Sequence, residues 1–76
     1  MMNVKKTREN MTEQALSVES VMRGHTRISL QALSEACSMS TVTTEFILEQ
    51  MVYYGVAQRG AFGRYSLTQE YKVGNF

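Results

Sequence analysis

The chain has 76 residues, a formal net charge of +1 and 43% hydrophobic residues. This length gives one small domain without room for a large active-site cavity, and no apolar run is long enough to span a bilayer. The lone cysteine, Cys37, and the lone histidine, His25, exclude a disulfide framework and a metal site of ordinary ligand spacing. The sequence contains no paired carboxylates, no nucleophile beside a base and no phosphate-binding glycine motif, so we expect neither an enzyme nor a cofactor.

The first nine residues carry Lys5, Lys6 and Arg8 but show no hydrophobic periodicity. Residues 1–9 are therefore predicted to form a flexible basic arm. They also lack the apolar core of a signal peptide, so we expect a cytoplasmic protein without a membrane partner.

A helix is predicted over residues 11–23, because apolar residues recur there at helical spacing. Asn10 and Glu13 have the spacing of a capping box at its start. Gly24 is suited to end the helix in the left-handed conformation. The four residues that follow are too few for a helix and are predicted to form a minimal strand with Ile28 in the core.

Two further helices are predicted over residues 30–37 and 41–54. Ser29 and Ser40 stand at their N-cap positions, where a serine oxygen accepts hydrogen bonds from the free amides of the first turn. Gly55 ends the second helix, because glycine enters the left-handed conformation without steric cost. Two helices joined by so short a turn cannot lie antiparallel. The pair is therefore predicted to be a helix-turn-helix, with an ordinary helical hairpin as the alternative.

The periodicity changes from helical to alternating after Gly55. Residues 56–59 and 64–67 are predicted strands joined by a four-residue turn with a glycine at each end, a composition typical of a hairpin. No cap or turn is evident in residues 68–76, which we treat as a C-terminal tail. Residues 10–67 are thus predicted to form a mainly α domain with a small β-hairpin, in the order α-β-α-α-β-β of a winged helix-turn-helix.

The core of this domain is predicted from the apolar residues at the inward positions of each element. These residues are Leu16, Ile28, Leu33, Leu48, Met51 and Leu67. Truncating Leu48 to alanine is expected to cost about 2–5 kcal/mol, a large share of the stability of so small a domain.

The third helix and the start of the hairpin resemble the recognition-helix pattern of bacterial winged-helix transcription regulators. The resemblance rests on Ser40, Thr43, Thr44, Leu48, Met51, Gly55 and Val56. A narrower resemblance, to the small fimbrial-operon regulators of enterobacteria of the PapI/FaeA type, rests on Met39-Ser40, Ile47-Leu48-Glu49-Gln50-Met51 and Gly55-Val56. It covers residues 28 to 67 and implies transcriptional control of surface-fibre operons, alongside the leucine-responsive regulatory protein.

Three residues of the third helix depart from that pattern. Thr44 stands where such proteins usually have an apolar residue. Glu45 and Glu49 lie on or beside the expected DNA face, where acidic groups repel phosphates. The alternative function is therefore a winged-helix protein-interaction module that modulates another regulator or assembly and binds little DNA directly.

If the third helix enters the major groove of double-stranded DNA, its first residues contact the bases or the adjacent phosphates. Those residues are Ser40, Thr41, Val42 and Thr43. Arg59 and Arg64 flank the hairpin tip and are predicted to contact phosphates or the minor groove. The candidate contacts with a protein partner, either another transcription regulator or a second copy in a homodimer, are Phe46, Tyr53 and Phe62. For Phe62, at the hairpin tip, a wedge and packing back on Tyr65 are the alternatives.

Overall fold

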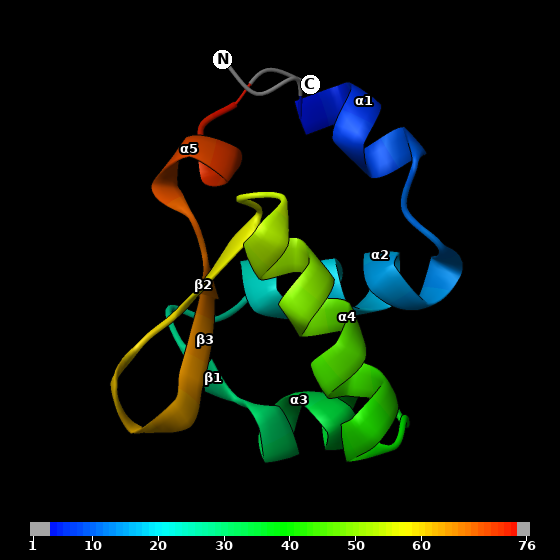
Figure 1. The fold of residues 1–76 in the computed structure, drawn as a ribbon, viewed down its shortest axis with the longest axis vertical. Coiled ribbons are helices and arrows are strands. Elements are labelled where there is room, and N and C mark those ends of the chain that lie inside the picture. The colour runs from blue at the N-terminus through cyan, green and yellow to red at the C-terminus, as the bar shows by residue number, and fades with distance from the viewer. Residues whose placement is uncertain (1–3, 75–76) are drawn as a thin grey trace.

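The structure, a computed structural model, describes residues 4–74. Its elements in chain order are α1 (Val4–Glu9), α2 (Glu13–Arg23), β1 (Ile28–Ser29), α3 (Leu30–Ala36), α4 (Thr41–Tyr53), β2 (Ala57–Arg59), a 3-10 turn (Ala61–Gly63), β3 (Arg64–Leu67) and α5 (Gln69–Lys72). The three strands form one antiparallel sheet in the order β1-β3-β2. Figure 1 shows the sheet beside α4, with α3 at one end of the molecule and α1 and α5 at the other. None of the described helices is long and apolar enough to cross a membrane.

The predicted winged helix-turn-helix order is present. Four of the helices have a serine or threonine at the N-cap position. The capping oxygen accepts from the amide three residues on, and the N-caps are Thr12, Ser29, Ser40 and Thr68. The predicted caps of α3 and α4 are therefore confirmed. The predicted cap Asn10 is wrong, because this residue lies in the turn that ends α1 and its amide bonds back to Lys6 O and Thr7 O. The helix α2 consequently begins two residues later than predicted.

The two glycines that were predicted to end helices behave differently. Gly55 has a φ of 77°, which confirms the left-handed stop after α4. Gly24 has a φ of −83°, so the prediction of a left-handed stop after α2 is wrong. There the chain ends the helix with short-range bonds instead, from Gly24 N to Val21 O and from His25 N to Met22 O, both at 3.1 Å.

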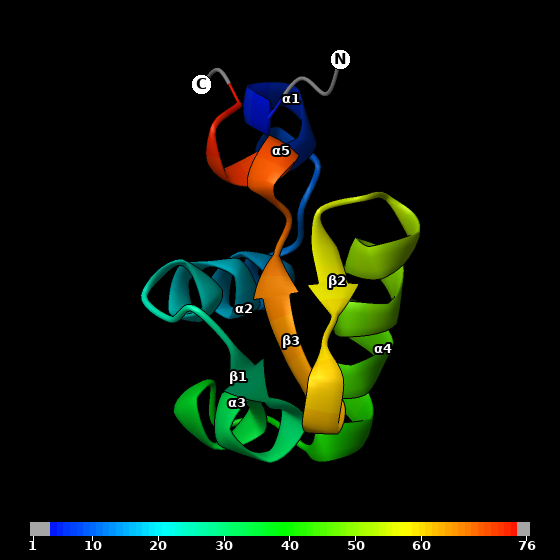
Figure 2. The same cartoon turned by 90° about the vertical axis from the view of Figure 1, so that its left-hand side faces the viewer.

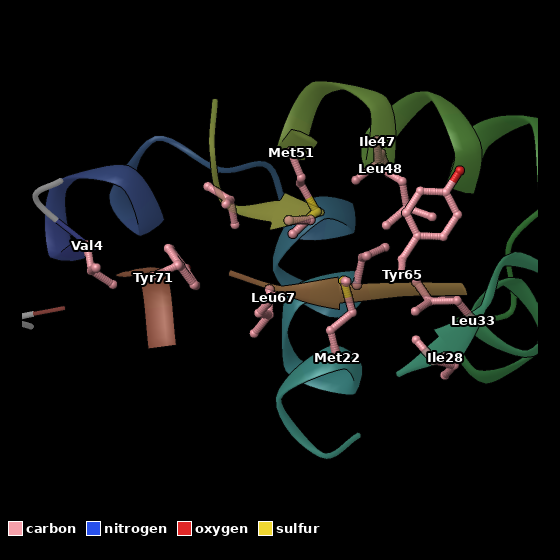
Figure 3. Packing of buried hydrophobic residues seen from close by; sticks show 13 residues of the cluster. Val4, Met22, Ile28, Leu33, Ile47, Leu48, Met51, Tyr65, Leu67 and Tyr71 are labelled. Atoms are coloured by element: carbon pink, nitrogen blue, oxygen red, sulfur yellow. The ribbon is translucent and has the colours of Figure 1, made fainter. Parts of the chain in front are cut away.

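The register of the sheet brings apolar side chains of all three strands together over the helices. Ile28 on β1 faces Tyr65 on β3, and Ala57 on β2 faces Leu67 on β3. All four residues are buried. Figure 3 shows Ile28, Tyr65 and Leu67 in one cluster with side chains of α2, α3 and α4.

Most of the predicted core is confirmed. The buried members are Ile28, Leu33, Leu48, Met51 and Leu67. Leu16 is only half-buried, so its assignment to the core is wrong. Instead, α2 buries Val18 and Met22, which lie four residues apart and therefore share one face of the helix.

The N-terminal segment is not a flexible arm where the structure describes it. Residues 4–9 form α1, and Val4 is fully buried. A Cβ atom added to Gly74 would overlap the Val4 side chain, so the first described helix packs directly against the end of the chain. The rest of the predicted arm, residues 1–3, lies outside the described residues.

The C-terminal segment also packs on the body of the protein. Thr68 caps α5, and its hydroxyl donates a hydrogen bond to Gly55 O at 2.7 Å. Tyr71 on α5 is fully buried. Figure 2 shows α5 and α1 adjacent at the end of the molecule away from α3. Sequence analysis found no cap here and missed α5, while residues 75–76 lie outside the described residues.

Candidate nucleic-acid interface

The helix α4 has one face in the core and a second apolar surface facing outward. The core face consists of Thr44, Ile47, Leu48 and Met51. The outward side chains Val42, Phe46, Tyr53 and Tyr54 are 77%, 63%, 82% and 67% exposed. No lysine or arginine lies on this helix. A helix that is apolar on two sides usually has a second surface to bury, so α4 is the first candidate for a binding surface.

The first turn of α4 is fixed by hydroxyl groups. Ser40 Oγ accepts from Thr43 N at 3.1 Å and donates to Thr43 Oγ1 at 3.0 Å. The buried hydroxyl of Thr44 donates to Ser40 O at 2.9 Å. This hydrogen bond satisfies the one polar side chain on the core face of α4. Thr41 and Val42 are exposed on the same turn. Two of the four candidate base-contacting residues therefore hold the helix end, and the other two present free side chains to solvent.

The wing, residues 57–67, is a hairpin with a tight tip. Gly60 N donates to Arg64 O at 2.7 Å and closes the loop. Phe62 and Gly63 both have a positive φ, of 61° and 69°. Phe62 is 94% exposed, so the tip of the wing carries a large ring that packs on nothing in the described chain.

One of the two wing arginines is already paired. Arg59 Nη2 on β2 donates to Glu49 Oε2 on α4, and this hydrogen bond raises the pKa of the guanidinium. Sequence analysis treated Glu49 as a repelling charge and Arg59 as a free contact, and it missed their pairing. Arg64 is exposed on β3 and forms no ion pair with another residue in the described range 4–74.

The start of α4 and the tip of the wing lie toward the same end of the molecule, away from α1 and α5 (Figures 1 and 2). This arrangement brings Thr41 and Val42 to the same end as the wing. Tyr53 lies on the last turn of α4, about 18 Å further along the helix axis. Its ring contacts Tyr54 edge-on, with centroids 5.1 Å apart. The structure thus separates Tyr53 from the candidate residues in the first turn of α4.

A groove of about 610 Å³ lies between α4 and the connection from α1 to α2. Met11, Phe46 and Tyr54 supply apolar walls, and Asn10 and Gln50 supply amide groups. No charged side chain lines it. Sequence analysis missed this groove because its two walls come from segments far apart in the chain, and only Thr7 belongs to the segment that was predicted to be flexible.

The fold is similar to those of several solved structures, one of which is a transcriptional regulator. A MarR family transcriptional regulator from Silicibacter pomeroyi superposes with a TM-score of 0.79 at 21% sequence identity, over 87% of this chain and 48% of that one. RV1404 from Mycobacterium tuberculosis superposes with a TM-score of 0.79 at 16% identity, over 91% of this chain and 51% of that one. Ligand-free NadR gives 0.74 at 18% identity, over 88% of this chain and 52% of NadR.

The chain spans about half the length of these solved structures. No protein-family model matches the sequence, and no curated protein matches it. The narrower resemblance to fimbrial-operon regulators therefore stays a prediction. Sequence identities this low establish the fold alone, and that fold is the winged helix.

Proposed function

We propose that this chain is a small bacterial transcription regulator that binds double-stranded DNA through a recognition helix, residues 41–54, and the wing. The observation that carries the proposal is the common position of the exposed first turn of α4 and the wing tip at one end of the fold. In helix-turn-helix proteins the N-terminal residues of the second helix contact the base edges. The solved MarR family transcriptional regulator with this fold supports the same class of function.

The residues at this end have separate roles in the proposal. The Thr41 hydroxyl hydrogen-bonds a base edge, and the Val42 methyl groups contact a thymine methyl. Ser40 and Thr43 hold the first turn, and in the proposal their hydroxyls also contact phosphates of the duplex. Arg64 contacts phosphate from the wing, whereas Arg59 is held back by Glu49.

A titration of labelled duplexes tests the proposal. Binding to random and genomic duplexes is measured by gel shift at several low salt concentrations. Arg64→Ala is expected to weaken binding to all duplexes and to flatten the log–log salt dependence by about 1 unit. Thr41→Ala is expected to reduce the preference for the best genomic site by about 1–3 kcal/mol. Absence of duplex binding by the wild-type protein at low salt would contradict the proposal.

A second candidate function is a protein-interaction module that modulates another regulator. The absence of basic residues from α4 and the uncharged groove beside it favour this alternative. Phe46→Ala removes a wall of the groove and tests it. Loss of a regulator partner in a co-purification with unchanged duplex binding would favour the module, while loss of duplex binding alone would favour the regulator.

The resemblance to the PapI/FaeA type supports a narrower role in the control of surface-fibre operons, together with the leucine-responsive regulatory protein. Gel shifts on a fimbrial-operon fragment, with and without that protein, test this role against a fragment of equal length from another operon. Equal affinity for both fragments would contradict the narrower role and leave general DNA binding intact.

Self-association into a homodimer is tested separately by sedimentation of the free chain.

A further inference from the structure

Phe62 occupies an unusual position for an aromatic residue. It lies at the tip of the wing with 94% of its surface exposed. Its φ of 61° is in the left-handed region, which glycine and asparagine adopt at lower cost than an aromatic residue. Neither burial nor backbone preference therefore accounts for a large ring at this position.

The surroundings of Phe62 favour insertion of the ring into a narrow groove of a ligand over burial in a broad protein interface. Its neighbours in the tip, Gly60, Ala61 and Gly63, are small. A protein anchor residue usually lies within a contiguous apolar patch whose rim excludes water. Here one exposed ring stands among small residues, and Arg64, two residues further on, adds an exposed positive charge on β3.

We propose that Phe62 is a wedge that enters the minor groove of bound DNA and partly unstacks one base step. This inference rests on the proposed function, because it requires the wing to lie against a duplex. Apolar side chains inserted in this way kink the duplex toward the major groove. Pyrimidine–purine steps such as TA unstack most easily. Phe62 would thus give the protein a preference for deformable steps without any hydrogen bond to a base.

Three variants test the wedge. Phe62→Asn removes the ring and places a residue that tolerates the left-handed conformation, so the variant should melt at the same temperature as the wild type or higher. Phe62→Leu keeps an apolar wedge. Val73→Asn, which removes an exposed apolar side chain next to α5 at the opposite end of the molecule, is the matched control.

The probes are two short duplexes that place a 2-aminopurine·T pair either beside a central TA step or in a sequence of otherwise only G·C pairs. Fluorescence of 2-aminopurine reports unstacking, and energy transfer between end labels reports bending. With the TA duplex, wild-type protein, Phe62→Leu and Val73→Asn should raise the fluorescence and shorten the end-to-end distance. Phe62→Asn should lose both signals and bind that duplex about tenfold more weakly, with the salt dependence unchanged because no phosphate contact is lost.

The outcomes separate the wedge from the proposed function. Duplex binding by the wild type without a fluorescence or distance change, or signals that persist in Phe62→Asn, overturns the wedge and leaves DNA binding intact. Equal affinity of wild type and Phe62→Asn for the TA duplex also overturns it and directs attention to a protein pocket for the ring. Failure of the wild type to bind either duplex overturns both.

Discussion

Glu19 is a carboxylate with no exposed surface, and it connects both ends of the chain to the body of the protein. The Tyr71 hydroxyl donates to Glu19 Oε2 at 2.7 Å. Arg8 Nε and Arg23 Nε each lie 3.0 Å from the same oxygen. The Arg23 guanidinium also lies over the Tyr71 ring, 5.2 Å from its centroid. Because these partners come from α1, α2 and α5, one buried charge positions three helices.

Replacing Glu19 with alanine should destabilise the fold. The change leaves the buried Tyr71 hydroxyl without its acceptor and removes the shared charge partner of two arginines. We expect the free energy of unfolding to fall by about 1–3 kcal/mol, measured by urea unfolding. Glu13→Ala, an exposed glutamate on the same helix, is the control and should change it by about 0.5 kcal/mol or less. Equal losses in the two variants would contradict a structural role for the buried carboxylate.

The stability of the wild type should also depend on the ionisation of Tyr71. Burial, together with the hydrogen bond to Glu19, raises the pKa of this phenol from 10.0 to about 12. The fold therefore favours the neutral phenol, and this contribution is complete below pH 10.0 and is lost as the pH rises toward about 12. Urea midpoints across this window should fall more steeply for the wild type than for Tyr71→Phe, which has no proton to lose. Parallel curves would contradict the raised pKa.

At the scale of elements, the turn between α3 and α4 sets the direction of α4. Ser38 has a φ of 53°, and Met39 N donates to Ser34 O at 2.9 Å, so the chain changes direction within a few residues. Ser40 then caps α4 and binds Thr43. The side chain that ends the turn thus also starts the helix that we propose to enter the major groove.

Alanine substitution of the two serine caps should separate stability from binding. Ser29→Ala and Ser40→Ala each remove an N-cap, so both should lower the free energy of unfolding by about 1 kcal/mol in a urea titration. Only Ser40 lies at the first turn of α4, so only Ser40→Ala should also weaken duplex binding in a gel shift. Equal binding losses in both variants would show that the effect arises from lost stability alone.

The elements that could be predicted from the sequence are those with strong local signals. Ser29, Ser40 and Gly55 fix the ends of α3 and α4 through contacts within a few residues. The helices α1 and α5 have six and four residues and are too short to be stable alone. They depend on burial of Val4 and Tyr71 against distant parts of the chain, which no local spacing reveals.

In the candidate site, too, the features with strong local signals could be predicted from the sequence. The first turn of α4 and the wing arginines are marked by a cap and by flanking glycines, so they could be located in the sequence. The pairing of Arg59 with Glu49 depends on how β2 docks on α4, and the exposure of Phe62 depends on the loop conformation. Both arise only when the hairpin and the helix have been placed relative to each other.

At the scale of the whole molecule, the two ends are specialised differently. One end is closed by α1 and α5 around Glu19, and the other presents the start of α4 and the wing (Figures 1 and 2). The net charge of +1 gives little long-range attraction to DNA, so the proposed DNA binding would depend on the local balance of charge near α4. The two glutamates of α4, Glu45 and Glu49, carry its negative charge, and only Glu49 is paired with an arginine.

Glu49 holds Arg59, whereas Glu45 is exposed and forms no ion pair with a residue in the described part of the chain. Glu49→Gln should therefore remove a negative charge and also release a guanidinium to contact phosphate. We expect it to tighten binding to all duplexes and to steepen the log–log salt dependence by about 1 unit. Glu45→Gln should tighten binding without a change in slope, because it adds no phosphate contact.

The slopes come from duplex affinities at several salt concentrations, and the double variant Glu49→Gln with Arg59→Ala is the control. It should return the slope to the wild-type value, because the released guanidinium is then absent. Arg59→Ala alone should change the slope little, since Arg59 is already occupied by Glu49 in the free protein. Equal slopes for Glu49→Gln and Glu45→Gln would place Arg59 away from the phosphates and leave Arg64 as the wing residue that contacts DNA.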